Sequence, residues 1–193
     1  MEGRRLPRPE DPALGRARAL YGASFPRHEQ RLPDEQRAVL SHPEYHFTQL
    51  FDGAEFVGLL LYWEPEDFRS VEHFCVRPEL RGRRYGAKAL EELGRDGKTV
   101  VLEIDPPVDD IARRRQGFYQ RCGFAVNPYP HVHPPYRPEY PGHELVVLSS
   151  PRALTPAEYG AFACYLSAVV MAWGAGSGRA RRGERQQPRR TTV

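Results

Sequence analysis

A short basic turn between a predicted strand and a predicted helix carries the residues best suited to chemistry. Residues 71–90 read VEHFCVRPELRGRRYGAKAL, and the turn holds four cations, Arg81, Arg83, Arg84 and Lys88. Free backbone N–H groups at the start of a helix bind anions, whereas the helix dipole disfavours cations there by about 0.3–1 kcal/mol each. The cluster therefore indicates a bound polyphosphate, with a solvated basic turn as the alternative. The G-x-x-x-x-G-K-[ST] and G-x-G-x-x-G nucleotide loops are both absent from the sequence.

One carboxylate, Glu72, lies in the strand that leads into this turn. Because side chains alternate along a strand, one face is predicted to carry Ser70, Glu72, Phe74 and Val76. That face is otherwise largely apolar, and burial in it would raise the pKa of Glu72 towards that of a useful general base. His73 is expected on the opposite face, in a structural role.

The cysteines and histidines do not form a convincing metal site. The three cysteines are widely separated and form no C-x-x-C pair, so neither a disulfide framework nor a thiolate zinc site is expected. This usage fits a reducing compartment, and we expect a cytoplasmic protein in which Cys75 is a small core residue. His131 and His133 suggest metal ligation, but the surrounding run YPHVHPPYRPEY is too rich in proline for a rigid ligand scaffold. We therefore expect no metal.

The elements that position these residues follow from hydrophobic periodicity and turn signals. The pattern predicts helices at residues 11–24, from 33, 85–93, 109–121 and 155–173, and strands at residues 45–51, 55–63, 70–76, 99–104, 124–126 and 144–148. A strand meander followed by alternating strands and helices is typical of an α/β (α+β) fold in which helices cover a mixed sheet. The length predicts one domain over residues 1–174.

The C-terminal end differs in composition from the rest of the chain. Residues 175–193 hold six Arg and one Glu, a balance of +5 against +3 for the whole chain, so the remainder carries −2. We expect this tail to be disordered and solvated, and nucleic-acid contact is the less favoured alternative. The apolar run at 159–173 is shorter than the roughly 20 residues that span a bilayer. A helix buried in the domain or in a homodimer interface is therefore expected rather than a membrane anchor.

Two motifs lie in a recognisable order along the chain. The basic turn reads Arg81-Gly82-Arg83-Arg84-Tyr85-Gly86, and a later unit joins Leu102-Glu103-Ile104 to the helix end FYQRCGF at residues 118–124. In order and spacing they resemble the GNAT superfamily of N-acetyltransferases, over about residues 45–148. The resemblance implies a mixed, mostly antiparallel sheet with helices on both faces. Arg84 stands where this family usually has the first glycine of its [Q/R]-x-x-G-x-[G/A] signature.

The resemblance also implies where the co-substrate acetyl-CoA would bind. Backbone amides from Arg81 to Ala87 would hold its pyrophosphate. Backbone N–H groups near Phe74, Cys75 and Val76 would lie beside the pantetheine and meet the oxyanion that forms from the thioester.

Acetyl transfer to an amine needs a neutral amine and a proton for the departing thiolate. By resemblance, Tyr119 would donate that proton, since a phenol is protonated at neutral pH. Glu72 or Glu103 would handle the amine proton, through water or directly, or would only bind a cationic acceptor. Transfer is expected to be direct, in a ternary complex.

The acceptor stays open, although a small-molecule amine or amino-acid derivative is favoured over a protein terminus. The proline-rich run is expected to wall the acceptor site, with Tyr129, Tyr136 and Tyr140 as contacts. A non-catalytic acyl-CoA sensor on the same fold is one alternative, because fold does not fix function. An RNA-directed acetylating enzyme guided by the Arg-rich tail is another.

Overall fold

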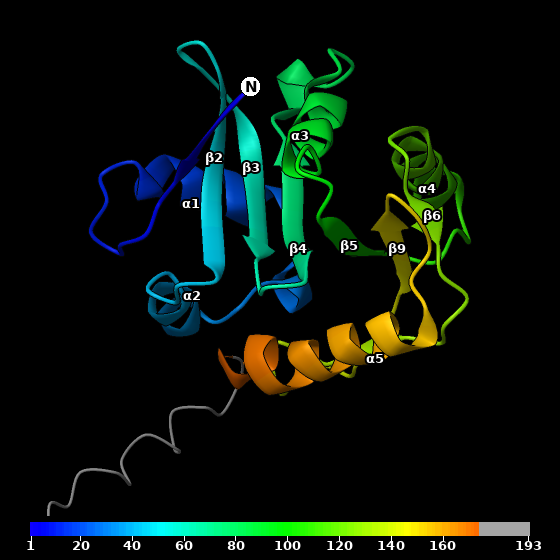
Figure 1. The fold of residues 1–193 in the computed structure, drawn as a ribbon. Coiled ribbons are helices and arrows are strands. Elements are labelled where there is room, and N and C mark those ends of the chain that lie inside the picture. The colour runs from blue at the N-terminus through cyan, green and yellow to red at the C-terminus, as the bar shows by residue number, and fades with distance from the viewer. Residues whose placement is uncertain (174–193) are drawn as a thin grey trace, which may run out of the picture.

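The computed structural model describes residues 1–173, and a mixed sheet of seven strands forms its centre (Figure 1). The strands lie in the order β1-β2-β3-β4-β5-β9-β6. Every neighbouring pair is antiparallel except β4 and β5, which run parallel, so the expected mostly antiparallel sheet is confirmed. The strands are β1 (Glu2–Arg5), β2 (Tyr45–Asp52), β3 (Glu55–Trp63), β4 (Phe68–Val76), β5 (Thr99–Ile104), β6 (Ala125–Val126) and β9 (Val146–Ser150). A separate hairpin pairs β7 (Val132–His133) with β8 (His143–Glu144).

Helices cover both faces of the sheet, as the sequence predicted (Figure 1). On one face α1 (Leu14–Ser24), α2 (Pro33–Val39) and α5 (Pro156–Tyr165) bury a core that includes Phe47, Leu61 and Trp63. On the other face α3 (Tyr85–Leu93) and α4 (Asp110–Arg121) bury a core that includes Val57, Leu60 and Val71. Because β3 contributes alternate side chains to both cores, it reads as a continuous apolar run.

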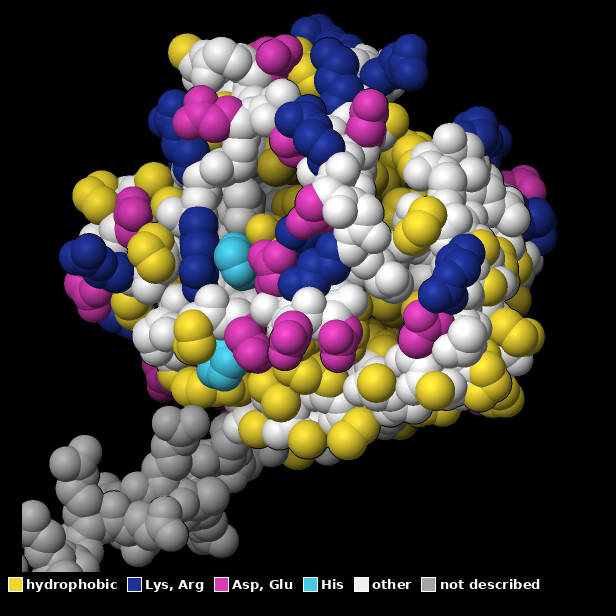
Figure 2. Space-filling model, viewed as in Figure 1, with side chains coloured by type: hydrophobic (Ala, Val, Ile, Leu, Met, Phe, Trp, Pro, Cys, Tyr) yellow, Lys and Arg dark blue, Asp and Glu magenta, His cyan; other side chains and the backbone are white. Residues whose placement is uncertain are grey.

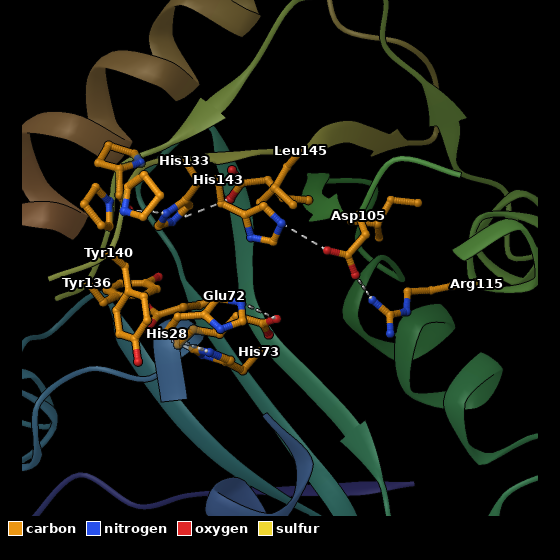
Figure 3. Close-up of a pocket in the computed structure, with 16 residues that line it drawn as sticks. His28, Glu72, His73, Asp105, Arg115, His133, Tyr136, Tyr140, His143 and Leu145 are labelled. Atoms are coloured by element: carbon orange, nitrogen blue, oxygen red, sulfur yellow. Dashed lines mark hydrogen bonds and ion pairs between the residues drawn. The ribbon is translucent and has the colours of Figure 1, made fainter. Parts of the chain in front are cut away.

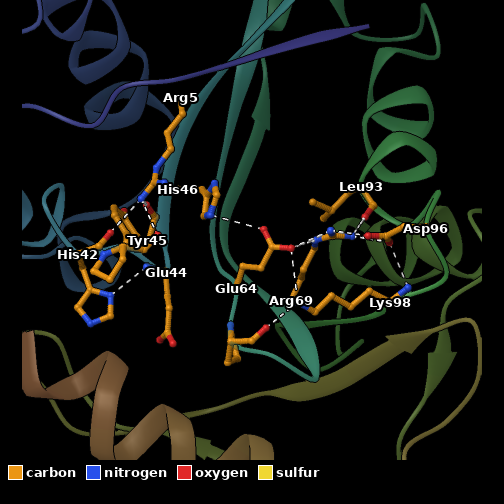
Figure 4. A network of polar contacts seen from close by, with 12 residues as sticks. Arg5, His42, Glu44, Tyr45, His46, Glu64, Arg69, Leu93, Asp96 and Lys98 are labelled. Atoms are coloured by element: carbon orange, nitrogen blue, oxygen red, sulfur yellow. Dashed lines mark hydrogen bonds and ion pairs between the residues drawn. The ribbon is translucent and has the colours of Figure 1, made fainter.

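The edge strand β1 was not predicted, because its sequence EGRR has no alternating apolar residues. Its backbone pairs with β2, and Arg5 fixes the end of the pair (Figure 4). The Arg5 guanidinium donates to the carbonyl oxygens of His42, Pro43 and Tyr45 at 2.9, 2.8 and 2.6 Å. Polar backbone and side-chain contacts, rather than hydrophobic pattern, therefore hold this strand.

The C-terminal helix is shorter than predicted. The α-helix α5 ends at Tyr165, and the chain continues as a π-helix over Leu166–Val170 and a 3₁₀ turn over Met171–Trp173. Within residues 1–173 no helix combines the length and apolarity needed to cross a membrane. The basic tail predicted at 175–193 lies outside the described residues.

The crossover from β4 through α3 to β5 is held by one arginine (Figure 4). Arg69 of β4 donates to the carbonyl of Leu93 at the end of α3, at 2.5 Å. It also pairs with Asp96 at 2.7 Å and with Glu64 at 2.8 Å. These contacts fix the start of the parallel pair, where Phe68 of β4 lies opposite Thr99 of β5.

Candidate active site

The parallel strands β4 and β5 part in the middle of the sheet. They pair only from Phe68 and Thr99 to Val71 and Leu102. Beyond these residues β4 continues to Val76 alongside β3, while β5 continues alongside β9. One edge of each strand is therefore free of a strand partner, and the opening between them connects the two faces of the sheet.

A β-bulge in β4 lies at the point where the strands part. Leu61 of β3 pairs with His73, but the next residue, Tyr62, pairs with Val71. Glu72 is thus the extra residue of the bulge, and the alternation of side chains shifts by one position after it.

The bulge overturns the predicted faces of β4. Glu72 and His73 both contact the side of the sheet that α1 and α5 cover, whereas Phe74 and Val76 pack in the core under α3 and α4. The prediction that Ser70, Glu72, Phe74 and Val76 share one face is therefore wrong, as is the placement of His73 opposite Glu72. The buried, structural environment predicted for His73 is nevertheless found, because its Nε2 lies 2.9 Å from the Glu29 carbonyl.

Two backbone N–H groups of β4 point into the opening. The amide of Arg77 donates to Val57 at 2.9 Å, so alternate residues, including Cys75, direct their amides towards β3. The amides of Phe74 and Val76 consequently face away from β3, on the side where β5 no longer pairs. Of the three amides predicted to meet a thioester, the register leaves these two available and uses that of Cys75 within the sheet. Cys75 itself is buried in the core, as predicted.

The basic turn is exposed and opens directly into α3. Arg81, Gly82, Arg83 and Arg84 are all exposed, and Lys and Arg side chains gather at this end of the molecule (Figure 2). Gly82 has φ +80°, and Arg84, at the helix N-cap, has φ +63°. Within residues 1–173 Arg84 is the one non-glycine residue with positive φ. It adopts the left-handed conformation that costs an L-residue about 1–2 kcal/mol, at the position where the resembling family has glycine.

None of the four cations of this turn forms an ion pair with another residue in the described part of the chain. Arg81 donates from Nε to the Val76 carbonyl at 3.3 Å, which ties the turn to the end of β4. Such unpaired cations beside free helix N–H groups make a favourable site for phosphate groups.

Gly86 lets α3 approach α4 closely. A Cβ atom at Gly86 would lie 3.1 Å from the Phe118 ring and 3.7 Å from the Phe74 ring. Tyr119, the next residue of α4, is 9% exposed and packs on Phe124. Burial raises the pKa of Tyr119 to about 12, so its hydroxyl keeps its proton at neutral pH and can act as an acid.

A pocket of about 110 Å³ lies on the opposite face of the sheet, where β4 and β5 part (Figure 3). Its floor is formed by Glu72 and His73 of β4 and by Glu103, Ile104 and Asp105 at the end of β5. The outer wall comes from the proline-rich segment, including His133, Tyr136, Tyr140 and His143. The segment therefore walls a pocket as predicted, with Tyr136 and Tyr140 lining it. Tyr129 instead packs on Tyr159.

Glu72 is neutralised by a buried arginine. Arg31 binds both carboxylate oxygens, at 2.9 and 3.1 Å, and the Trp63 indole N–H donates at 2.5 Å. The side chains of Arg31 and Glu72 are 0% and 2% exposed. Burial by itself would raise the pKa of Glu72, but the Arg31 charge and hydrogen bonds outweigh it and hold that pKa well below 4.5. The predicted rise is therefore wrong, because the sequence did not reveal this partner.

Glu103 has a different environment, because its partners are histidines. His131 hydrogen-bonds to Oε1 through Nε2, and His133 Nε2 lies 4.0 Å from Oε2. The other ring nitrogen of His131 lies 3.1 Å from the Tyr159 hydroxyl. The sequence singled out His131 and His133 only as a metal candidate. Within residues 1–173, no cluster of three or more His, Cys, Asp or Glu residues could hold a metal ion.

A polar chain at the rim joins the pocket wall to α4 (Figure 3). His143 Nε2 lies 3.2 Å from Asp105, and Arg115 of α4 pairs with the same carboxylate at 2.6 Å. Arg115 and Tyr119 lie one turn apart on α4. The rim of the pocket and the helix that carries the candidate acid are thus held in a fixed relation.

Comparisons with known proteins agree with this geometry. A sequence profile of the acetyltransferase (GNAT) family matches residues 14–124, more than half of the chain. YjbC of Bacillus subtilis (strain 168), assigned as an acetyltransferase, is 31% identical over 68 residues, which are 34% of this chain and 35% of that protein. The chain thus matches about a third of the length of this curated relative.

Solved structures share the fold over nearly the whole domain. A structure from Bacteroides thetaiotaomicron, assigned to the same family, superposes with a TM-score of 0.80 at 28% identity, over 88% of this chain and 98% of that chain. An aminoglycoside 6'-N-acetyltransferase in complex with coenzyme A superposes with a TM-score of 0.54 at 14% identity, over 78% and 96% of the two chains. The second likeness shows the fold alone.

Proposed function

Because the chain belongs to the GNAT family of acetyltransferases, we propose that it transfers an acetyl group from acetyl-CoA to a primary amine. The observation that carries the proposal is the opening between β4 and β5. It has the exposed basic turn at one end, two free backbone amides along one edge and an acidic pocket on the far face. A thioester can pass through this opening from the side of the turn to the pocket.

The basic turn would bind the pyrophosphate of acetyl-CoA. The N–H groups at the start of α3 and the unpaired cations of residues 81–88 supply hydrogen bonds and charge for it. The tight packing of Gly86 against Phe118 brings α3 close to α4, so the chain would run from the turn along β4 towards Tyr119. The coenzyme A bound in the aminoglycoside acetyltransferase supports this co-substrate for the fold.

The chemistry would then proceed by direct transfer. The amine nitrogen attacks the thioester carbon, and the N–H groups of Phe74 and Val76 stabilise the charge that develops on its oxygen. The carbon–sulfur bond breaks, and the Tyr119 hydroxyl gives its proton to the leaving thiolate. The amine proton goes to Glu103, because the charge of Glu72 is already committed to Arg31.

The acceptor would be a small amine that is cationic in solution. Glu103 offers a carboxylate at the pocket floor, and its second oxygen has no hydrogen bond within residues 1–173. The aromatic rings of Tyr136, Tyr140 and His28 around it favour an ammonium group, since cations are attracted to ring faces.

Two measurements test the proposal. Titration calorimetry of coenzyme A into the protein is expected to give a binding heat that weakens as salt rises, since phosphate contacts are screened. Release of free thiol from acetyl-CoA is then followed with a panel of primary amines, for the wild type and Tyr119→Phe. Turnover that Tyr119→Phe loses supports the enzyme, whereas binding without turnover by the wild type would favour the acyl-CoA sensor. Absence of binding would remove both.

A further inference from the structure

Three side chains from three separate elements meet behind the floor of the pocket. Glu103 comes from β5, His131 from the segment before β7, and Tyr159 from α5. Glu103 is 10% exposed and His131 3% exposed as side chains. Glu103 lines the pocket, while His131 approaches it from the side of α5, where its ring packs on Phe162 at 5.7 Å.

The Tyr159 hydroxyl can donate its single proton in two directions. One acceptor is the Pro130 carbonyl at 3.0 Å, and the other is Nδ1 of His131 at 3.1 Å. The opposite ring nitrogen of His131, Nε2, hydrogen-bonds to Glu103. A carboxylate only accepts hydrogen bonds, so Nε2 must carry a proton whenever Glu103 is ionised. The protonation of Nδ1 is the one that can change.

Both charge states of His131 are consequently satisfied by hydrogen bonds. When the imidazole is cationic, Nδ1–H donates to the Tyr159 oxygen and the hydroxyl donates to Pro130. When the imidazole is neutral, the hydroxyl turns and donates to Nδ1. In the first state the cation compensates the charge of Glu103, and in the second the carboxylate keeps its full negative charge.

We propose that Glu103, His131 and Tyr159 act as one unit, in which His131 and Tyr159 are positioning residues that set how strongly Glu103 attracts the acceptor's proton. This inference rests on the proposed acetyl transfer. Loss of the proton from Nδ1 removes the compensating cation. A bound ammonium then loses one proton: its N–H bond breaks, an O–H bond forms at Oε2 of Glu103, and the electron pair stays on nitrogen for the attack.

Other charged groups face this unit and must be considered in any pH profile. His133 lies 4.0 Å from Oε2 of Glu103. The remaining charged or titratable groups around the same pocket are His28, Glu29, Glu72 with Arg31, His73, Asp105 with Arg115, Tyr136, Tyr140 and His143. Only His131 connects Glu103 to a hydroxyl with two acceptors, so variants at His131 and Tyr159 separate its titration from theirs.

The test compares pH profiles of kcat/KM for the amine at saturating acetyl-CoA. His131→Gln keeps a donor for Glu103 but cannot titrate, so the acid-side inflection due to His131 should disappear while turnover persists at lower pH. Tyr159→Phe removes the acceptor of the cationic imidazole. Because hydrogen bonds to charged groups are the stronger ones, the inflection should move about half to one pH unit lower.

Tyr129→Phe provides the matched control. Its ring stacks on Tyr159 at 4.2 Å, but its hydroxyl donates to the Leu154 carbonyl at 2.9 Å and not to His131. This variant loses a hydroxyl from the same aromatic stack and is expected to keep the wild-type profile. A shift in Tyr129→Phe equal to that in Tyr159→Phe would assign the effect to packing and overturn the inference.

A second measurement does not depend on turnover. Nitrogen-15 NMR of the His131 ring above pH 8 should show the proton on Nε2 and a hydrogen-bonded, unprotonated Nδ1. A proton on Nδ1 with a bare Nε2 would overturn the inference, as would superimposable profiles of wild type and His131→Gln. A wild type that binds coenzyme A but acetylates no amine would instead refute the proposed function, and this inference with it.

Discussion

The structure separates the roles of two carboxylates that the sequence left equivalent, and substitution of Glu72 tests that separation. Glu72→Gln removes the negative charge opposite Arg31, whose side chain is 0% exposed. Leaving a buried charge without its partner costs about 3–5 kcal/mol. For a urea m-value of about 2 kcal/mol/M, a loss of about 4 kcal/mol lowers the unfolding midpoint by about 2 M.

The matched variant, Glu103→Gln, is expected to behave in the opposite way. Its partner His131 can become neutral, so no fixed charge is stranded and the midpoint should change much less. Loss of a general base typically costs 100-fold or more in rate, so turnover should fall by about that factor while coenzyme A binding persists. Urea unfolding followed by circular dichroism, together with steady-state thiol release, gives both quantities.

A double variant makes the comparison independent of folding yield. Arg31→Met combined with Glu72→Leu removes both buried charges, and replacing a buried ion pair by apolar side chains is often nearly neutral. We expect this variant to recover most of the lost stability and to retain turnover. If Glu72→Gln were as stable as the wild type but inactive, or if the stable double variant were inactive, Glu72 would be the base and the reasoning from its pairing would be refuted.

Four further changes test other parts of the structure. Tyr119→Phe should lower kcat by about 100-fold with an unchanged calorimetric Kd for coenzyme A, and an unchanged kcat would exclude it as the acid. Arg84→Gly removes left-handed strain of about 1–2 kcal/mol at a backbone-entropy cost of about 0.5–1 kcal/mol, so urea unfolding should show equal or higher stability, whereas Arg84→Val should be less stable. Because the folded-state pKa of Glu72 lies below 4.5, its stabilisation is complete above pH 4.5 and declines as pH falls below it, and an acid-unfolding curve should show this decline in the wild type but not in the Arg31→Met, Glu72→Leu variant. Gly86→Ala should cost about 1–3 kcal/mol through its contact with Phe118, and Phe118→Leu should restore part of that loss if the contact is the cause.

Local signals predicted the elements and the basic turn well. The Thr155 capping box, the alternation in the β2–β3 hairpin and the glycine after α4 are all contained within a few residues of sequence. The cations ahead of α3 were recognisable for the same reason, since their electrostatic conflict with a helix N-terminus is local. Features of this kind require no knowledge of which distant segments meet.

Features that depend on distant contacts could not be predicted. Arg31 and Glu72 lie 41 positions apart, and a single sequence does not indicate which buried arginine meets which carboxylate. The bulge at Glu72 adds one residue to a strand whose apolar pattern is compatible with either register. His131 and Tyr159 meet only because the proline-rich segment and α5 pack together beside β5.

The match to the family profile ends at residue 124, and the proline-rich wall of the pocket lies entirely beyond it. The opening between the strands and the basic turn fall inside the matched region, whereas His131, His143 and Tyr159 fall outside it. The donor half of the reaction is therefore encoded in sequence this chain has in common with many acetyltransferases, and the recipient half in sequence particular to it. A chimaera that exchanged only the segment after residue 124 would be expected to change what is acetylated and leave unchanged what supplies the acetyl group.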